Sequence, residues 1–354
     1  ARAARDAQAA LDALSSAAGG ATATLQEQRG ARAEGAALRE MTLTDALAEV
    51  VAAGARDGAY LLDEDLLNGL YQTEGPSEPA RRVFHDVFAL DEGAFGASLF
   101  GADAFPPQLA PGLALVAASR AARSSLHADP YSWLGWNLCA RGCKLWTFVA
   151  PTMESDSPTS HLLQMRPKPP VAWGGDGGSD DGSSPYGIGA GAESELDLYA
   201  GFDATQLDSL ADAGEEEVAF ALAEQSELVR ELLRAGADVR VAVQRPGEWM
   251  LIPPDWVHQV IHGPESIGVA GQHLNMGHWS PFARHVLSYC GVGADSVAEI
   301  VSRTERLART DAADGVIALL DAALAARHGL QEAEALMDSL MGAWDEEMDA
   351  ALGL

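Results

Sequence analysis

Three side chains have the types and spacing of a metal site built from two histidines and one carboxylate. His127 and Asp129 lie in the segment SSLHADP. If this segment is a strand, alternate residues point to one face, so both side chains can reach the same cation. A second apolar segment, RPGEWMLIPPDWVH, ends at His258. Two imidazoles and one carboxylate that leave coordination positions open suit Fe(II) and oxygen chemistry.

Each half of this pattern is weak when taken alone. A single H-x-D pair occurs by chance in many proteins, and a lone histidine in an apolar strand is more often a hydrogen-bonded core residue. Three further histidines near the second segment leave a zinc or manganese site with three or four imidazoles as an alternative; these are His262, His273 and His278. The joint presence of both halves favours the two-histidine, one-carboxylate site.

Two blocks of short apolar runs must position these residues, and they span residues 113–150 and 239–273. Runs of this length predict strands, and we expect the blocks to form the two halves of one sheet system. Between them, residues 174–195 consist almost entirely of Gly, Ser and Asp. That composition predicts a flexible loop inserted into one domain. A helix is expected over residues 214–236, before the second block.

The two ends of the chain read as helical. Residues 1–40 are rich in Ala and predict a helical arm, and an amphipathic helix is expected from Thr42 to Gly54. After Pro281, apolar residues at helical spacing predict helices over 282–290, 295–309, 312–327 and 330–350. We expect these last helices to form a C-terminal region, 281–354, that covers the β core.

The two blocks together resemble one known family. The run HADPYSWLGWNLCARGCKLWTFVAP, followed by RPGEWMLIPPDWVHQVIHGPESIGV, is similar to the JmjC family of 2-oxoglutarate oxygenases, particularly its small protein-hydroxylase subgroup. The resemblance implies a mainly β core with α: a double-stranded β-helix, or cupin-like jelly roll, over residues 41–280. N-terminal helices and the helical C-terminal cap would flank this domain. It also implies iron near one open end of the β-helix.

The resemblance assigns roles to five residues of the first block and one of the second. His127, Asp129 and His258 match the iron ligands, and Lys144 matches the lysine that pairs with the distal carboxylate of 2-oxoglutarate. A lysine inside an apolar strand costs several kcal/mol unless it is paired, and a dicarboxylate would pair it. The alternative is an ammonium that reaches solvent along its own stem. Asn137 and Ser124 match polar co-substrate contacts, although either is also an ordinary polar residue of a strand.

The segment IGVAGQHLN departs from the family pattern. Relatives carry an Asn on the interior face of this strand, whereas here Gln272 stands at the matching distance and Asn275 is a second candidate. We therefore expect one of these two side chains to contact the co-substrate.

The activity implied by the resemblance depends on Fe(II), 2-oxoglutarate and O2, and we expect hydroxylation of a protein side chain. Demethylation of N-methyl-lysine or N-methyl-arginine by the same chemistry is one alternative. A cupin metalloenzyme that does not use 2-oxoglutarate is another, and an inactive JmjC-like scaffold is the third. The scaffold has no need for the three ligands together with Lys144, and the other cupins have no need for Lys144.

Charge narrows the choice of partners. The chain holds 52 acidic and 23 basic residues, a net charge of −29. This charge repels phosphate backbones and anionic membrane surfaces, so we expect neither direct nucleic-acid binding nor membrane association. A basic protein segment is the expected substrate, although an acidic surface also serves solubility alone.

The three cysteines, Cys139, Cys143 and Cys290, form no regular disulfide framework, so a reducing compartment is expected and the protein is placed inside the cell, in cytoplasm or nucleus. No apolar run reaches the ~18 residues of a membrane span. The C-terminal helices offer two arrangements, a homodimer through their apolar faces or packing on the core of the same chain.

Overall fold

The structure is a computed structural model. It describes residues 19–28, 38–52, 58–63, 97–100, 105, 113–151, 196–210 and 213–352, with a few positions between 5 and 16. The flexible loop predicted at 174–195 lies outside the described residues.

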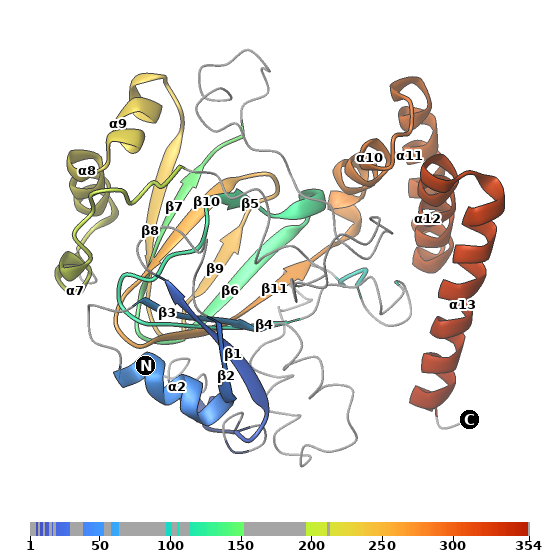
Figure 1. The fold of residues 1–354 in the computed structure, drawn as a ribbon. Helices are drawn as coiled ribbons and strands as arrows, with labels where there is room; N and C mark the ends of the chain where they lie inside the picture. The colour runs from blue at the N-terminus through green and yellow to red at the C-terminus, as the bar shows by residue number, and fades with distance from the viewer. Residues whose placement is uncertain are drawn as a thin grey trace.

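Two antiparallel sheets form the centre of the molecule (Figure 1). The seven-stranded sheet has the order β2 (Leu38–Thr42), β1 (Thr22–Gln28), β3 (Gly58–Asp63), β4 (Ala114–Ala118), β11 (Ser266–His273), β6 (Leu134–Arg141), β9 (Trp249–Ile252). The four-stranded sheet has the order β5 (His127–Ala128), β10 (Val257–His262), β7 (Lys144–Val149), β8 (Val239–Gln244). The prediction that both blocks build one sheet system is confirmed, since each block supplies strands to both sheets.

The alternation of side chains along β7 and β10 separates an interior face from an outer face. Trp146 and Phe148 of β7 pack with Val260 of β10 and with Ile252 of β9, which belongs to the other sheet. Leu145 and the other odd-numbered apolar residues of β7 pack outward instead. The even-numbered side chains of these two strands therefore lie between the sheets.

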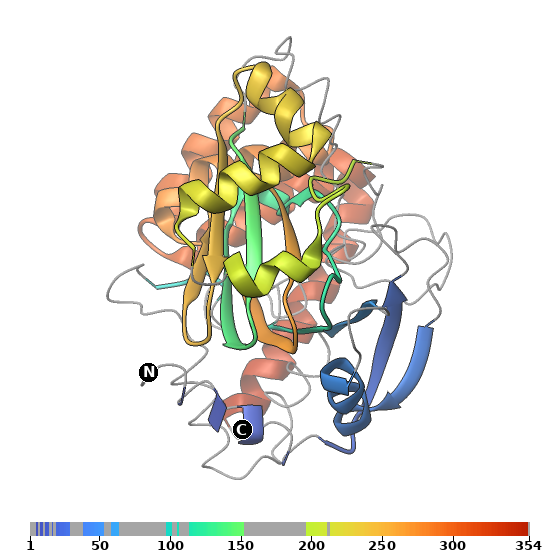
Figure 2. The ribbon, with the colours of Figure 1, turned by 90° about the vertical axis from the view of Figure 1, so that its left-hand side faces the viewer.

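Helices α7 (Leu207–Leu210), α8 (Glu215–Gln225) and α9 (Glu227–Arg234) cover the outer face of the four-stranded sheet, and Figure 2 shows them lying across its strands. The single helix predicted over 214–236 is wrong in one respect. Ser226 has an extended backbone (φ −93, ψ 120) and its side chain accepts a hydrogen bond from the Val229 N–H, so it ends α8 and caps α9. Serine favours this capping role over a helix interior.

The N-terminal prediction is partly wrong. Helix α2 (Leu43–Ala52) forms where it was expected, but residues 22–28 and 38–42 are strands of the larger sheet, although the helical arm was predicted over 1–40. Ala23 and Leu25 are buried while Thr22 and Thr24 are exposed. This alternation of period two, with β-branched Thr, outweighs the helical propensity of the Ala-rich composition.

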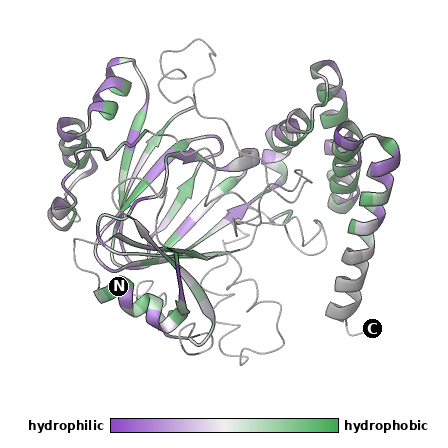
Figure 3. Ribbon diagram, in the orientation of Figure 1, coloured by the Kyte–Doolittle hydropathy of each residue, from purple (hydrophilic) through white to green (hydrophobic). Residues whose placement is uncertain are grey.

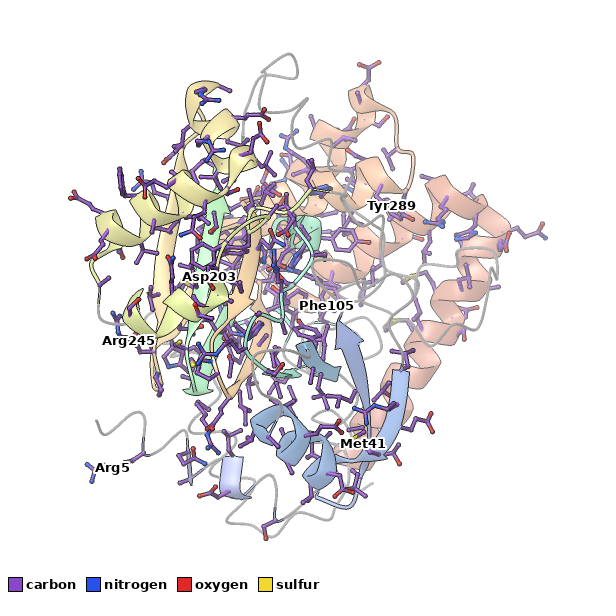
Figure 4. The ribbon with its side chains drawn as sticks, turned by 60° about the vertical axis from the view of Figure 1, so that its left-hand side comes forward. Arg5, Met41, Phe105, Asp203, Arg245 and Tyr289 are labelled. Carbon is purple, nitrogen blue, oxygen red and sulfur yellow. The ribbon has the colours of Figure 1, made fainter. Side chains whose placement is uncertain are left out.

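Four C-terminal helices confirm the predicted ones: α10 (Trp279–Tyr289), α11 (Ala294–Ala308), α12 (Ala312–His328) and α13 (Leu330–Leu352). Helix α12 is rich in apolar residues, coloured green in Figure 3, and several of them join a core that includes Tyr131 and Trp133 beside the sheets. Phe105, labelled with Tyr289 in Figure 4, places its ring 6.3 Å from that of Phe282 in the same core. These helices pack on the core of their own chain.

None of the described helices is long and apolar enough to cross a membrane.

Candidate metal centre

The three predicted ligands converge at one end of the space between the sheets. Strands β5 and β10 are paired so that His127 lies opposite His258, and Asp129 follows β5 directly in an extended conformation. One ligand atom from each residue lies within 4.8 Å of the other two. The Nε2 atoms of His127 and His258 are 3.8 and 3.9 Å from Oδ1 of Asp129. This group can bind a metal ion.

Backbone carbonyls fix the orientation of both imidazoles. Nδ1 of His127 is 2.8 Å from the Ser125 carbonyl, and Nδ1 of His258 is 3.1 Å from the Trp256 carbonyl. A carbonyl only accepts, so each Nδ1 carries the proton and each Nε2 keeps its lone pair. Both lone pairs are on the side of Asp129, in the arrangement that metal-binding histidines usually adopt.

Burial keeps His258 neutral. Its side chain is 2% exposed and lies against the rings of Trp146 and Phe148, with centroids 6.0 and 5.9 Å away. Burial, followed by the neighbouring His127, lowers the pKa of His258 to about 4. At neutral pH it is therefore an uncharged ligand. His127, whose side chain is 26% exposed, marks the open side of the group.

Asp129 is held in a tight surrounding that includes a glycine. A Cβ atom at Gly135 would overlap Oδ2 of Asp129 and approach Cβ of Ile252 to 3.1 Å. Gln272, opposite Gly135 in the sheet, places its Nε2 3.4 Å from the same oxygen. The Oε1 of Gln272 is buried and has no hydrogen-bond partner among the described residues, so an acceptor is available beside the ligand group.

The other end of the space between the sheets holds Lys144. Its side chain is 1% exposed, and its Nζ donates a 2.8 Å hydrogen bond to Oδ1 of Asn137. Within the part of the chain that the structure describes, no carboxylate pairs with it. Burial lowers the pKa of Lys144 to about 8. The alternative that its ammonium reaches solvent is wrong.

Histidine and glycine complete the surroundings of Lys144. His262 lies opposite it in the sheet, hydrogen-bonds to Ser266 Oγ at 2.9 Å, and has a pKa held well below the usual value by burial and by Lys144. A Cβ at Gly268 would come to 3.0 Å from Lys144 Nζ. His262 is uncharged at neutral pH and Gly268 has no charged side chain, so neither residue neutralises the ammonium of Lys144.

The remaining predicted residues divide into two kinds. Asn137 and Gln272 point between the sheets, at the lysine end and the ligand end respectively. The hydroxyl of Ser124 accepts the Val260 N–H at 3.0 Å and so supports β10. Asn275 caps the short helix Met276–His278, where its side chain accepts the Gly277 N–H at 2.8 Å. Of the two candidates in the segment that departs from the family pattern, Gln272 is the one that contacts a predicted ligand, Asp129.

The alternative site with more histidines has no geometric support. Among the described residues, only His127, Asp129 and His258 form a group of three or more potential ligands. His262 belongs to the lysine end, through its contact with Ser266.

The role of Gly135 beside Asp129 was not predicted from the sequence, although a glycine inside an apolar strand is a recognised sign of close approach by another group. The carbonyls that orient the imidazoles carry no sequence signal.

A scan against protein-family models finds no match to this chain, and no curated protein matches it.

Proposed function

We propose that the protein is a dioxygenase dependent on Fe(II) and 2-oxoglutarate, of the JmjC kind, that hydroxylates a protein side chain. The observation that carries this proposal is the joint placement, between the same two sheets, of a three-ligand group and a buried lysine that no carboxylate of the described residues pairs with. A structural metal site would need the ligands without the lysine.

The donor set fits Fe(II). It consists of two imidazole nitrogens and carboxylate oxygen, without sulfur, and three protein ligands leave other positions of an octahedral ion open. Asp129 balances part of the charge of a divalent cation, and the buried Oε1 of Gln272 is placed to accept a hydrogen bond from a group bound beside it.

The distance between the two ends fits a short dicarboxylate. His258 and His262 are four residues apart on β10, which places their Cα atoms ~13 Å apart. Lys144, opposite His262, extends its long side chain into the same interior. A five-carbon dicarboxylate bound to the metal by its keto acid would bring its second carboxylate to Lys144.

Strand order supports the double-stranded β-helix. From β4 to β11 the strands have the order 4-11-6-9 in one sheet and 5-10-7-8 in the other. The chain therefore passes to the other sheet after each of these strands except β7, which is followed by β8 in the same sheet. This strand order is the one that the two Greek keys of a jelly roll would give, and it supports that part of the proposal. The ligands come from β5, its following turn and β10, at one end of the layers.

Fe(II) with 2-oxoglutarate supplies the oxygen chemistry: 2-oxoglutarate and O2 become succinate and CO2, and one oxygen atom enters a C–H bond of the substrate. The chain's own residues bind and orient. His127 and His258 offer Nε2 lone pairs fixed by backbone carbonyls. Lys144 attracts and aligns the distal carboxylate, which in turn stabilises the charged form of the lysine. Trp146 and Phe148 keep the interior apolar and exclude water.

The proposed substrate is a basic protein segment, since the chain carries a net charge of −29. Long-range attraction of this kind raises association rates and weakens with added salt. Turnover that falls steeply with ionic strength would support a basic substrate, and salt-independent turnover would contradict it.

Succinate release tests the reaction without knowledge of the substrate. Protein reconstituted anaerobically with Fe(II) and 2-oxoglutarate is exposed to O2, and the native chain is compared with His127→Ala and Lys144→Ala. We expect succinate from the native chain, none from His127→Ala, and a higher 2-oxoglutarate requirement for Lys144→Ala. No succinate, together with no calorimetric binding of 2-oxoglutarate to metal-loaded protein, would leave a cupin of other chemistry or a scaffold. Formaldehyde release with methylated peptides would instead favour demethylation.

A further inference from the structure

Outside the ligand group, the side chains of Ser132, Asp255 and His285 lie close together, and we call this group the Ser132 junction. The Ser132 hydroxyl donates a 2.7 Å hydrogen bond to Oδ1 of Asp255 and lies 3.1 Å from Nδ1 of His285 on α10. Nδ1 of His285 and Oδ1 of Asp255 are 3.9 Å apart. Ser132 is 3% exposed, so its hydroxyl makes these contacts away from solvent.

The directions of the hydrogen bonds at this junction exclude Ser132 as a nucleophile and give the contacts a structural role. Ser132 has one hydroxyl proton, which is directed at the carboxylate oxygen of Asp255, so Nδ1–H of His285 donates to the serine oxygen. A nucleophilic triad would need the imidazole to accept the serine proton through one nitrogen and to donate to the carboxylate through the other. Here the same Nδ1 faces both groups.

Two residues of the junction are equally far along the chain from a predicted ligand. Ser132 follows Asp129 by three residues, and Asp255 precedes His258 by three. Ser132 and Asp255 have positive φ values of 55 and 64, a conformation that is unfavourable for most non-glycine residues. Such conformations persist only where the surroundings hold them, and they cluster at functional sites.

We propose that Ser132, Asp255 and His285 are positioning residues that clamp the two ligand-bearing turns to each other and to helix α10. This inference rests on the metal centre of the proposed function. The hydrogen bond from Ser132 to Asp255 fixes the distance between the turn after Asp129 and the turn before His258. His285 ties both turns to the C-terminal helices, and its ring also contacts that of Tyr131, with centroids 6.2 Å apart.

Glycine and asparagine substitutions separate this role from ordinary folding. Ser132→Gly and Asp255→Gly remove the clamp while relieving the positive φ, so the metal-free protein should not lose stability through strain. Asp255→Asn keeps an acceptor for the serine proton and tolerates the same backbone conformation. Ala121→Gly is the matched control, because Ala121 has a φ of 69 and no polar side chain.

The measurement is the affinity of the full chain for Mn(II), followed by the electron paramagnetic resonance signal of the free ion, together with the melting temperature of the metal-free protein. We expect Ser132→Gly and Asp255→Gly to weaken Mn(II) binding about tenfold, as loss of groups supporting ligands typically does. Asp255→Asn and Ala121→Gly should bind like the native chain, and all four should melt near the native temperature.

The clamp is overturned if Ser132→Gly binds Mn(II) as tightly as the native chain, or if Asp255→Asn is as weak as Asp255→Gly. It is also overturned if affinity is lost only in proportion to melting temperature. Failure of the proposed function would give results that differ from those that overturn the clamp. A native chain that binds Mn(II) but forms no succinate with Fe(II) refutes the oxygenase and leaves the clamp to be judged by affinity. A native chain that binds no Mn(II) refutes the metal centre and the clamp together.

Discussion

The two ends of the space between the sheets have opposite electrostatic needs. At one end, His127, Asp129 and His258 direct lone pairs and a carboxylate at a shared point. At the other, Lys144 brings an ammonium into the interior, where among the described side chains the amide oxygen of Asn137 accepts its hydrogen bond. One end has the electron-pair donors for a cation, and the other has a cation for which the described part of the chain supplies no anion.

The contrast between the two ends indicates which features of a buried polar site mark function. Core polar groups that serve stability are usually satisfied by their neighbours, as the Ser124 hydroxyl and the Gln244 amide are here. Lys144 and Gln272 Oε1 are left short of partners within the described chain. A ligand that satisfied both ends at once would explain why each end alone is incomplete.

The largest expected effect comes from removing the carboxylate of the ligand end. Asp129→Ala leaves two imidazoles without the negative charge that a divalent cation requires, so Mn(II) affinity should fall by more than the roughly 10–100-fold typical of a supporting residue. Calorimetric titration with Mn(II) measures this, and succinate formation should vanish. Native affinity in the variant would remove Asp129 from the ligand group.

The next effect concerns the charge at the other end. Lys144→Met keeps the length of the side chain but removes the partner of a buried carboxylate, so the 2-oxoglutarate concentration needed for half-maximal binding should rise about a hundredfold. Mn(II) affinity should change little, because the metal ligands are untouched. Equal losses of both affinities would mean that the two ends are not independent.

Lys144 also predicts a pH dependence of stability. Burial lowers its pKa from 10.5 to about 8. Between these values the unfolded chain binds more protons at this position than the folded chain, so the free energy of unfolding rises with pH. Relative to Lys144→Met, the ligand-free native chain should gain about 2 kcal/mol between about pH 7 and about pH 10, measured by urea unfolding. A flat difference would show that Lys144 is not desolvated as described.

A smaller effect is expected from the glycine beside Asp129. Gly135→Ala places a methyl group against Oδ2 of Asp129, so the carboxylate must move and Mn(II) affinity should fall about tenfold. Gly214→Ala is the control, because a Cβ there meets nothing within 4 Å. If both variants bind Mn(II) equally well, Asp129 has more freedom than its surroundings indicate.

The smallest effect tests whether Ser124 belongs to the site or to its support. Ser124→Ala leaves the Val260 N–H without its side-chain acceptor, which should lower the free energy of unfolding by about 1 kcal/mol. Binding of 2-oxoglutarate should not change. A clear loss of 2-oxoglutarate affinity at native stability would restore the co-substrate role that the family resemblance gave to Ser124.

Local patterns predicted the ligand group and the strands that carry it. His127 and Asp129 share one short segment, and period-two alternation assigns these two to a common face, whereas His258 was added from the second block and the family resemblance. Alternation also existed in residues 22–28, but the Ala-rich composition concealed it. Ser226 was missed because a serine within an apolar helical pattern ends the helix only when its side chain finds a backbone N–H. The choice between Gln272 and Asn275 needed the fold, since Asn275 falls beyond the strand.

The division of each block between two sheets has a consequence for the order of folding. Ser132 and Asp255, which stand beside the ligands, are 123 residues apart in the chain, so the centre cannot assemble from either half alone. Contacts of such long range are formed late, after the entropy of closing a large loop has been overcome. A ligand that binds only the completed arrangement adds its binding free energy to the stability of the whole domain. Metal loading would therefore report that synthesis and folding of both halves are complete.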